Sequence, residues 1–138
     1  MKRVLATSIA LACLSTGVQA DSIKTFRQLC LANAGNPSAI MAAGKKAGFD
    51  MTKIGESSAM GLRKKTDESL QINVFTNHAF ECAVTTSDMA NPDQVGAAFF
   101  KSLGLKPKRG QAKGSVGGQS YTFKHDSEGG EAFVMYRN

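Results

Sequence analysis

The sequence lacks tryptophan and contains only two histidines, three cysteines and three prolines. No glycine-rich turn ends in Gly-Lys-Ser/Thr, which excludes a phosphate-binding loop, and no Gly-x-Ser-x-Gly segment marks a nucleophile elbow. Acidic residues are also few, 11 in all, and most of them fall in turns or at helix starts. No two of them lie in an apolar stretch, as the paired carboxyl groups of a glycosidase require. The familiar signatures of an enzyme are therefore missing.

A long hydrophobic run is missing too, although the chain opens on an apolar segment. Two basic residues precede a short apolar run that reaches Leu14, and the segment ends on the small residue Ala20. The run is about half the ~20 residues that a membrane-spanning helix needs. These features are typical of a secretory signal peptide. We predict a signal peptide over residues 1–20 and a single α+β domain over residues 21–138, which is periplasmic or secreted and has no transmembrane segment.

Cys13 offers a second interpretation of this segment, because a lipoprotein signal is cut just before a cysteine that is then acylated. The residues before it, Ala10-Leu11-Ala12, place the leucine one position away from the usual lipoprotein pattern. We therefore expect Cys13 to be removed with the signal peptide, and we keep lipidation as the minor alternative.

Cys30 and Cys82 remain after the predicted cleavage. In an oxidising compartment, two cysteines in a small domain favour a disulfide, and two allow only one connectivity. A Cys-x-x-Cys motif is absent and no histidine lies near Cys30 in the sequence, so a metal or redox role lacks support. In the chain-entropy treatment, a bridge that closes a loop of about fifty residues stabilises the fold by about 4 kcal/mol.

The clearest pattern lies between Leu70 and Thr86, where apolar residues alternate with polar ones in two runs. A period of two with β-branched and aromatic residues predicts a half-buried antiparallel pair of strands. The polar segment 76–79 supplies the reversal between them. Cys82 then faces the core from the middle of the second strand.

Helix signals flank this hairpin. Ser22 is predicted to cap a first helix that runs to about Ala34 and turns Cys30 inward. Asn36-Pro37 and Asn91-Pro92 each combine a capping asparagine with a proline at the first helical position, and each predicts a further helix. The glycines at 48 and 104 are expected to end these two helices.

The two Asn-Pro helices resemble each other and are each followed by a basic link and then by a hairpin. We therefore predict an αββ–αββ layout, with chance similarity as the alternative. The last hairpin is placed at Ser120–Lys124 and Glu131–Tyr136, whereas the segment from Phe49 to Ser69 gives at most one edge strand. The predicted fold class is α+β: a twisted antiparallel sheet of roughly four to six strands with three helices on one face.

A basic, glycine-rich connection is expected between Leu105 and Gly118, and no acidic residue occurs between Gln94 and His125. A flexible basic loop of this kind can bind an anionic macromolecule of the cell envelope. Nucleic acid is not the expected partner, because the loop has no interleaved aromatic residues. A solvated loop without a partner is the alternative. The candidate partner-binding residues are Lys106, Lys108, Arg109 and Lys113.

The two histidines, His78 and His125, each have acidic residues close by in the sequence. If the ends of the two hairpins meet, these residues can form a zinc site, although their spacing matches no known motif. The simpler interpretation is that both are surface residues. We therefore expect no metal, no other cofactor and no catalytic residue, and we keep a small hydrolase using His78 or His125 as the alternative function.

The helix from Phe26 to Cys30 and the strand from Glu81 to Thr86 resemble segments of small uncharacterised exported proteins of Gram-negative bacteria, which also carry one helical and one mid-chain strand cysteine. This resemblance implies export and a disulfide, and it transfers no activity. We expect a non-enzymatic protein that binds a macromolecular partner in the envelope. Assembly with copies of itself is a further alternative.

Overall fold

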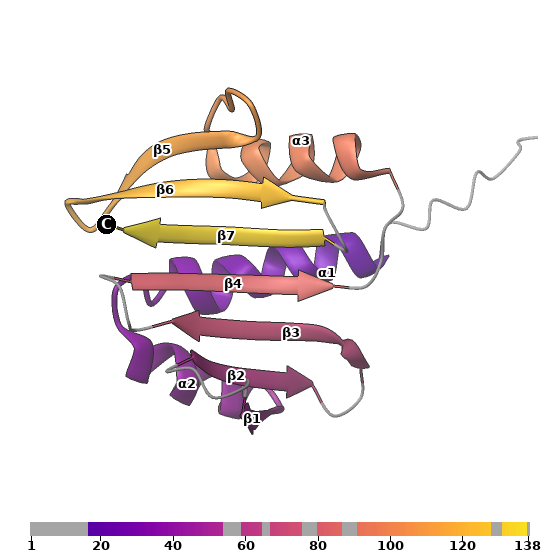
Figure 1. Cartoon of the computed structure of the whole chain (residues 1–138), viewed down its shortest axis with the longest axis vertical. Coiled ribbons are helices and arrows are strands. Elements are labelled where there is room, and N and C mark those ends of the chain that lie inside the picture. The colour runs from indigo at the N-terminus through magenta and orange to yellow at the C-terminus, as the bar shows by residue number, and fades with distance from the viewer. Residues whose placement is uncertain are drawn as a thin grey trace, which may run out of the picture.

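The fold is known from a computed structural model that describes residues 17–53, 59–64, 67–75, 80–86, 91–127 and 131–137. Its strands form a single seven-stranded antiparallel sheet in the order β1-β2-β3-β4-β7-β6-β5. Figure 1 shows β4 and β7 side by side in the middle of the sheet. The strands are β1 (Phe49–Lys53), β2 (Ala59–Lys64), β3 (Asp67–Phe75), β4 (Phe80–Thr86), β5 (Gln111–Val116), β6 (Gln119–Asp126) and β7 (Glu131–Arg137).

Helices cover one face of this sheet and leave the other face open (Figure 1). The first helix continues into a wider π-helical turn, η1, which contains Cys30 and in which the N–H of Ala32 bonds to the carbonyl of Arg27 at 3.0 Å. The helical elements are α1 (Gly17–Phe26), η1 (Arg27–Leu31), α2 (Pro37–Lys46) and α3 (Pro92–Leu103).

The predicted α+β class, the antiparallel sheet and the helices on one face are confirmed. The sheet has seven strands rather than four to six. The segment 49–69, expected to hold at most one edge strand, contributes β1, β2 and the start of β3, and the predicted basic loop contributes β5. The αββ–αββ layout is wrong in its strand number, because α3 is followed by three strands and α2 by four.

The central hairpin lies where the sequence predicts it. β3 pairs with β4 so that Ile72 lies opposite Val84 and Val74 lies opposite Cys82, and all four side chains are buried. The side chain of Leu70 and the segment 76–79 lie outside the described residues. A strand pair with one apolar face under helices explains the period-two pattern.

The predicted helix caps are confirmed in part. The Asn36 side chain accepts a hydrogen bond from the N–H of Ala39 at 3.0 Å, and Pro37 occupies the first turn. Asn91 instead makes no side-chain cap and adopts a left-handed conformation with φ 52°. Ser22 does not begin a helix, because α1 starts upstream at Gly17 and buries Ser22 within it. Residues 1–16 of the predicted signal peptide lie outside the described part of the chain.

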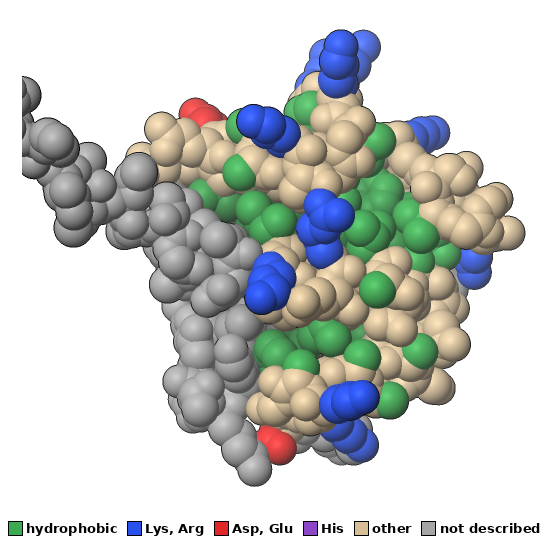
Figure 2. Space-filling model, turned by 180° about the vertical axis from the view of Figure 1, so that it is seen from behind, with side chains coloured by type: hydrophobic (Ala, Val, Ile, Leu, Met, Phe, Trp, Pro, Cys, Tyr) green, Lys and Arg blue, Asp and Glu red, His purple; other side chains and the backbone are tan. Residues whose placement is uncertain are grey.

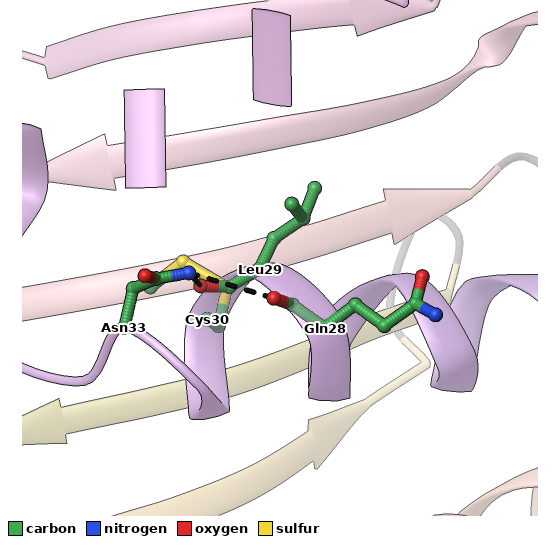
Figure 3. The surroundings of a disulfide bond; sticks show 5 residues. Gln28, Leu29, Cys30 and Asn33 are labelled. Atoms are coloured by element: carbon green, nitrogen blue, oxygen red, sulfur yellow. Dashed lines mark hydrogen bonds between the residues drawn. A yellow bond between two sulfur atoms is a disulfide. The ribbon is translucent and has the colours of Figure 1, made fainter. Parts of the chain in front are cut away.

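The Cys30–Cys82 disulfide joins η1 to the middle strand of the sheet (Figure 3). The two Cα atoms are 5.7 Å apart, within the usual range for a disulfide, and both cysteines are fully buried. The Asn33 side-chain amide donates to the carbonyls of Gln28 at 3.4 Å and Leu29 at 3.0 Å, which satisfies acceptors at the end of this helical segment. The predicted bridge is therefore confirmed.

Phenylalanines fill the space between the helices and the second half of the sheet. Phe26 of α1 meets Phe99 of α3 edge to face at 5.0 Å, and Phe99 lies 4.9 Å from Phe133 of β7. All three are fully buried. Such pairs contribute about 0.5–1.5 kcal/mol each beyond the area that they bury. Among the described residues, no helix has both the length and the apolar character needed to cross a membrane.

Candidate functional site

The predicted basic loop is an ordered structure rather than a flexible hinge. Lys108 and Gln111 exchange backbone hydrogen bonds of 2.8 and 3.2 Å, and the two residues between them, Arg109 and Gly110, have φ values of 53° and 71°. Positive φ at both central positions is the mark of a type I′ turn, which connects antiparallel strands tightly. The carbonyl of Gly110 also accepts the N–H of His125 at 3.1 Å, so the turn is fixed to β6.

The four predicted partner-binding residues do not share one face. Lys106, Lys108 and Arg109 are exposed on the connection between α3 and β5. Lys113 is also exposed, but it lies on β5 opposite Thr122. Side chains alternate along a strand, so Lys113 points to the sheet face that the helices leave open.

Two further cations, which were not among the predicted partner-binding residues, lie beside the connection. Arg27 of η1 donates from its Nη1 to the carbonyl of Ser102, next to Lys101 of α3, and both basic residues are exposed. We use the name basic edge for Arg27, Lys101, Lys106, Lys108 and Arg109. None of the five forms an ion pair with a residue that the structure describes. Figure 2 shows the helix-covered face, where lysine and arginine predominate over acidic side chains.

His125 does not occupy an ordinary surface position. Its ring stacks on Phe133 at 5.7 Å, and a Cβ atom built at Gly96 of α3 would lie 2.7 Å from His125 Nδ1. His125 is therefore half-buried between α3 and the sheet. His78 lies outside the described residues.

The described strand residues next to the two predicted hairpin turns lie at opposite ends of the sheet. β4 begins at Phe80 opposite Arg137 and ends at Thr86 opposite Glu131. Six residue steps at ~3.3 Å separate these two ends of the sheet by about 20 Å. No group of three potential metal ligands occurs among the residues for which coordinates are described.

A pocket of about 440 Å³ opens where the η1–α2 connection meets the ends of β6 and β7. Tyr121 of β6 and Arg137 of β7 form its polar wall, and Leu31, Ala34 and Val116 contribute apolar surface. We call this cavity the Tyr121 pocket. A second hollow of about 220 Å³ beside α3 shares Leu31 and Val116 with it and has Arg27 at its edge.

The polar wall of the Tyr121 pocket is held by side-chain contacts. The guanidinium of Arg137 lies 5.8 Å from the centre of the Tyr121 ring, a cation–π distance, and donates to Gln119 Oε1 at 3.5 Å. The Tyr121 ring also packs edge to face on Phe80 at 6.0 Å. A cation and a phenol therefore sit together at one end of the apolar core.

Tyr121 and Arg137 were not among the predicted site residues, although the sequence carries a signal for the arginine. Phe133, Met135 and Arg137 alternate along β7, so the arginine falls on the strand face whose other two members are fully buried. A charged residue in phase with core residues at a strand end is unusual. Tyr121 alternates with Phe123 in the same way, so the sequence pattern does not distinguish it from an ordinary core residue.

Comparison with protein-family models, with curated proteins and with solved structures gives no match to this chain.

Proposed function

We propose that this chain is an exported, non-enzymatic protein that binds an extended anionic partner of the cell envelope through the basic edge. The observation that carries the proposal is the set of five exposed cations without ion-pair partners among the described residues. A fixed turn holds Lys108 and Arg109 in place. Cations that are already positioned lose less conformational entropy on binding than cations on a mobile loop.

The magnitude of the attraction favours a large partner. Each Lys or Arg near an anionic surface contributes about 1 kcal/mol, so five contribute about 5 kcal/mol. That energy corresponds to a dissociation constant of roughly 0.2 mM. A single small anion reaches only one or two of these cations. A layer of lipid headgroups or an acidic polymer presents many negative charges and can engage several of these cations at once.

A binding assay with charge-reversal variants tests the proposal. The probes are vesicles rich in phosphatidylglycerol, neutral phosphatidylcholine vesicles and polyglutamate, each in low and in molar salt. We expect binding to an anionic probe in low salt and its loss in molar salt, where the Debye length falls to about 3 Å. Binding that is insensitive to salt contradicts the proposal.

Two triple variants distinguish binding through the basic edge from binding that depends only on the net positive charge of the protein. Reversal of Lys106, Lys108 and Arg109 to glutamate is expected to weaken binding on the order of 100-fold. Reversal of Lys45, Lys46 and Lys113 changes the net charge equally, but these residues lie on α2 and on the open sheet face. Equal loss in both triple variants contradicts a specific role for the basic edge.

Export is tested separately on the full chain. N-terminal sequencing of protein recovered from the periplasmic fraction is expected to begin at Asp21, as signal peptidase cleavage after Ala20 requires. Incorporation of a fatty-acid analogue at Cys13 would show a lipoprotein instead.

A further inference from the structure

We propose that the Tyr121 pocket binds a small carboxylate that carries an apolar group of a few carbon atoms. This site is distinct from the basic edge, since Tyr121 and Arg137 lie at the other end of β6 and β7 from the turn that holds Arg109. The proposal is therefore independent of the one above.

The Tyr121 hydroxyl is the first observation. The residue is only 3% exposed, and its hydroxyl makes no hydrogen bond with any residue that the structure describes. Buried hydroxyl groups in proteins nearly always have a partner. A Cβ atom built at Gly35, which lines the pocket, would lie 2.8 Å from Tyr121 Oη. The hydroxyl therefore points to the pocket wall, where a ligand can supply the missing acceptor.

Arg137 is the second observation. Its guanidinium stands over the Tyr121 ring and has no ion-pair partner among the described residues. A planar guanidinium binds a carboxylate through two parallel hydrogen bonds. None of the described residues that line the pocket is acidic, and α2 borders it with its N-cap, Asn36, and with Ala39 of its first turn. The positive end of a helix adds to the preference for an anion.

The apolar wall defines the rest of the ligand. Leu31 and Val116 separate the Tyr121 pocket from the second hollow, and both are half-buried. A carboxylate held by Tyr121 and Arg137 places its carbon chain against these two residues. The volume of about 440 Å³ lies within the range of small-molecule sites, roughly 300–1,000 Å³.

Isothermal titration calorimetry with two acids and their neutral analogues tests the proposal on the oxidised protein. The probes are hexanoate and hexanamide, together with acetyl-Ala-Leu bearing a free C-terminus and the same dipeptide as its amide. We expect at least one acid to bind, and its amide to bind roughly tenfold more weakly or worse. Binding of hexanoate alone identifies a free acid as the ligand, and binding of the dipeptide alone identifies a peptide C-terminus.

Three variants locate the site. Tyr121→Phe removes only the hydroxyl and is expected to weaken binding of the acid about tenfold, and Arg137→Gln is expected to weaken it further. Lys113→Gln removes a charge from the open sheet face and is expected to bind like the parent protein. Urea unfolding of each variant shows whether it is folded. If Arg137→Gln fails to fold, the binding measured for Tyr121→Phe alone shows whether the acid occupies the Tyr121 pocket. Acids that bind no better than amides overturn the proposal, as does unchanged binding in Tyr121→Phe.

Discussion

The Tyr121→Phe substitution also makes a prediction about stability, whose sign follows from the surroundings of one hydroxyl. Tyr121 is 3% exposed, and its ring contacts Phe80 and Arg137 at 6.0 and 5.8 Å. Phenylalanine keeps both ring contacts. The substitution therefore changes the free energy of unfolding only through the hydroxyl group.

The sign of the change in the free energy of unfolding depends on whether the Tyr121 hydroxyl is hydrogen-bonded within the protein. If the hydroxyl donated a hydrogen bond within the protein, its removal would cost about 1 kcal/mol. Because it makes no such bond with a described residue, removal relieves the cost of burying a polar group instead. We expect Tyr121→Phe to be as stable as the parent protein, or more stable by up to about 1 kcal/mol. For a domain of this length, the gain corresponds to a rise in Tm of up to about 4 °C.

Urea unfolding of the oxidised protein, followed by circular dichroism, measures this difference. Tyr136→Phe is the matched control, because Tyr136 is half-exposed and lies on the open face of the sheet. The control is expected to change stability by less than about 0.5 kcal/mol. A loss of about 1 kcal/mol in Tyr121→Phe at an unchanged m-value would refute the reasoning, since it would show a hydroxyl that is bonded within the fold.

Three further predictions concern the fold. Replacing both cysteines of the disulfide by alanine is expected to lower the free energy of unfolding by about 4 kcal/mol, and a thiol assay on the denatured, unreduced mature protein is expected to find no free sulfhydryl. Gly96→Ala is expected to lower the free energy of unfolding because the new methyl group meets the His125 ring. The same substitution in a His125→Ala background is expected to lower it much less. Equal losses in the two backgrounds would contradict the contact. Asn36→Ala is expected to cost about 1 kcal/mol in thermal unfolding because it removes the side-chain cap of α2, whereas Asn36→Asp, which keeps an acceptor oxygen, is expected to cost clearly less.

The sequence predicted best those elements whose local chemistry and tertiary packing agree. The β3–β4 hairpin has an apolar face under the helices, and α2 begins at an asparagine that caps it. In both cases the residue pattern and the packed structure require the same side chains. The prediction of the disulfide followed from the cysteine count and from the predicted compartment.

β5 was missed because its glycine was interpreted as a loop signal. A Cβ atom at Gly114 would lie 3.1 Å from the Phe123 ring and 3.2 Å from Leu105, so the glycine permits a close approach between the strand and its neighbours. Glycine within a strand often marks such an approach. The contact depends on residues distant in the sequence, and no local pattern shows it.

The Tyr121 pocket could not be predicted for a related reason. Its walls come from the η1–α2 connection, the β5–β6 turn and the end of β7, three segments that are far apart along the chain. Their proximity follows from the sheet order, which the period-two patterns of single strands do not specify.

The place of β7 has a consequence for biogenesis. This strand is the last along the described chain, yet it fills the gap between β4 and β6. A nascent polypeptide that has not yet delivered β7 keeps two unpaired strand edges and an uncovered set of phenylalanines, which are features that invite aggregation. Completion of the sheet must therefore wait for β7, so the chain is expected to stay open and prone to aggregation until this strand is available.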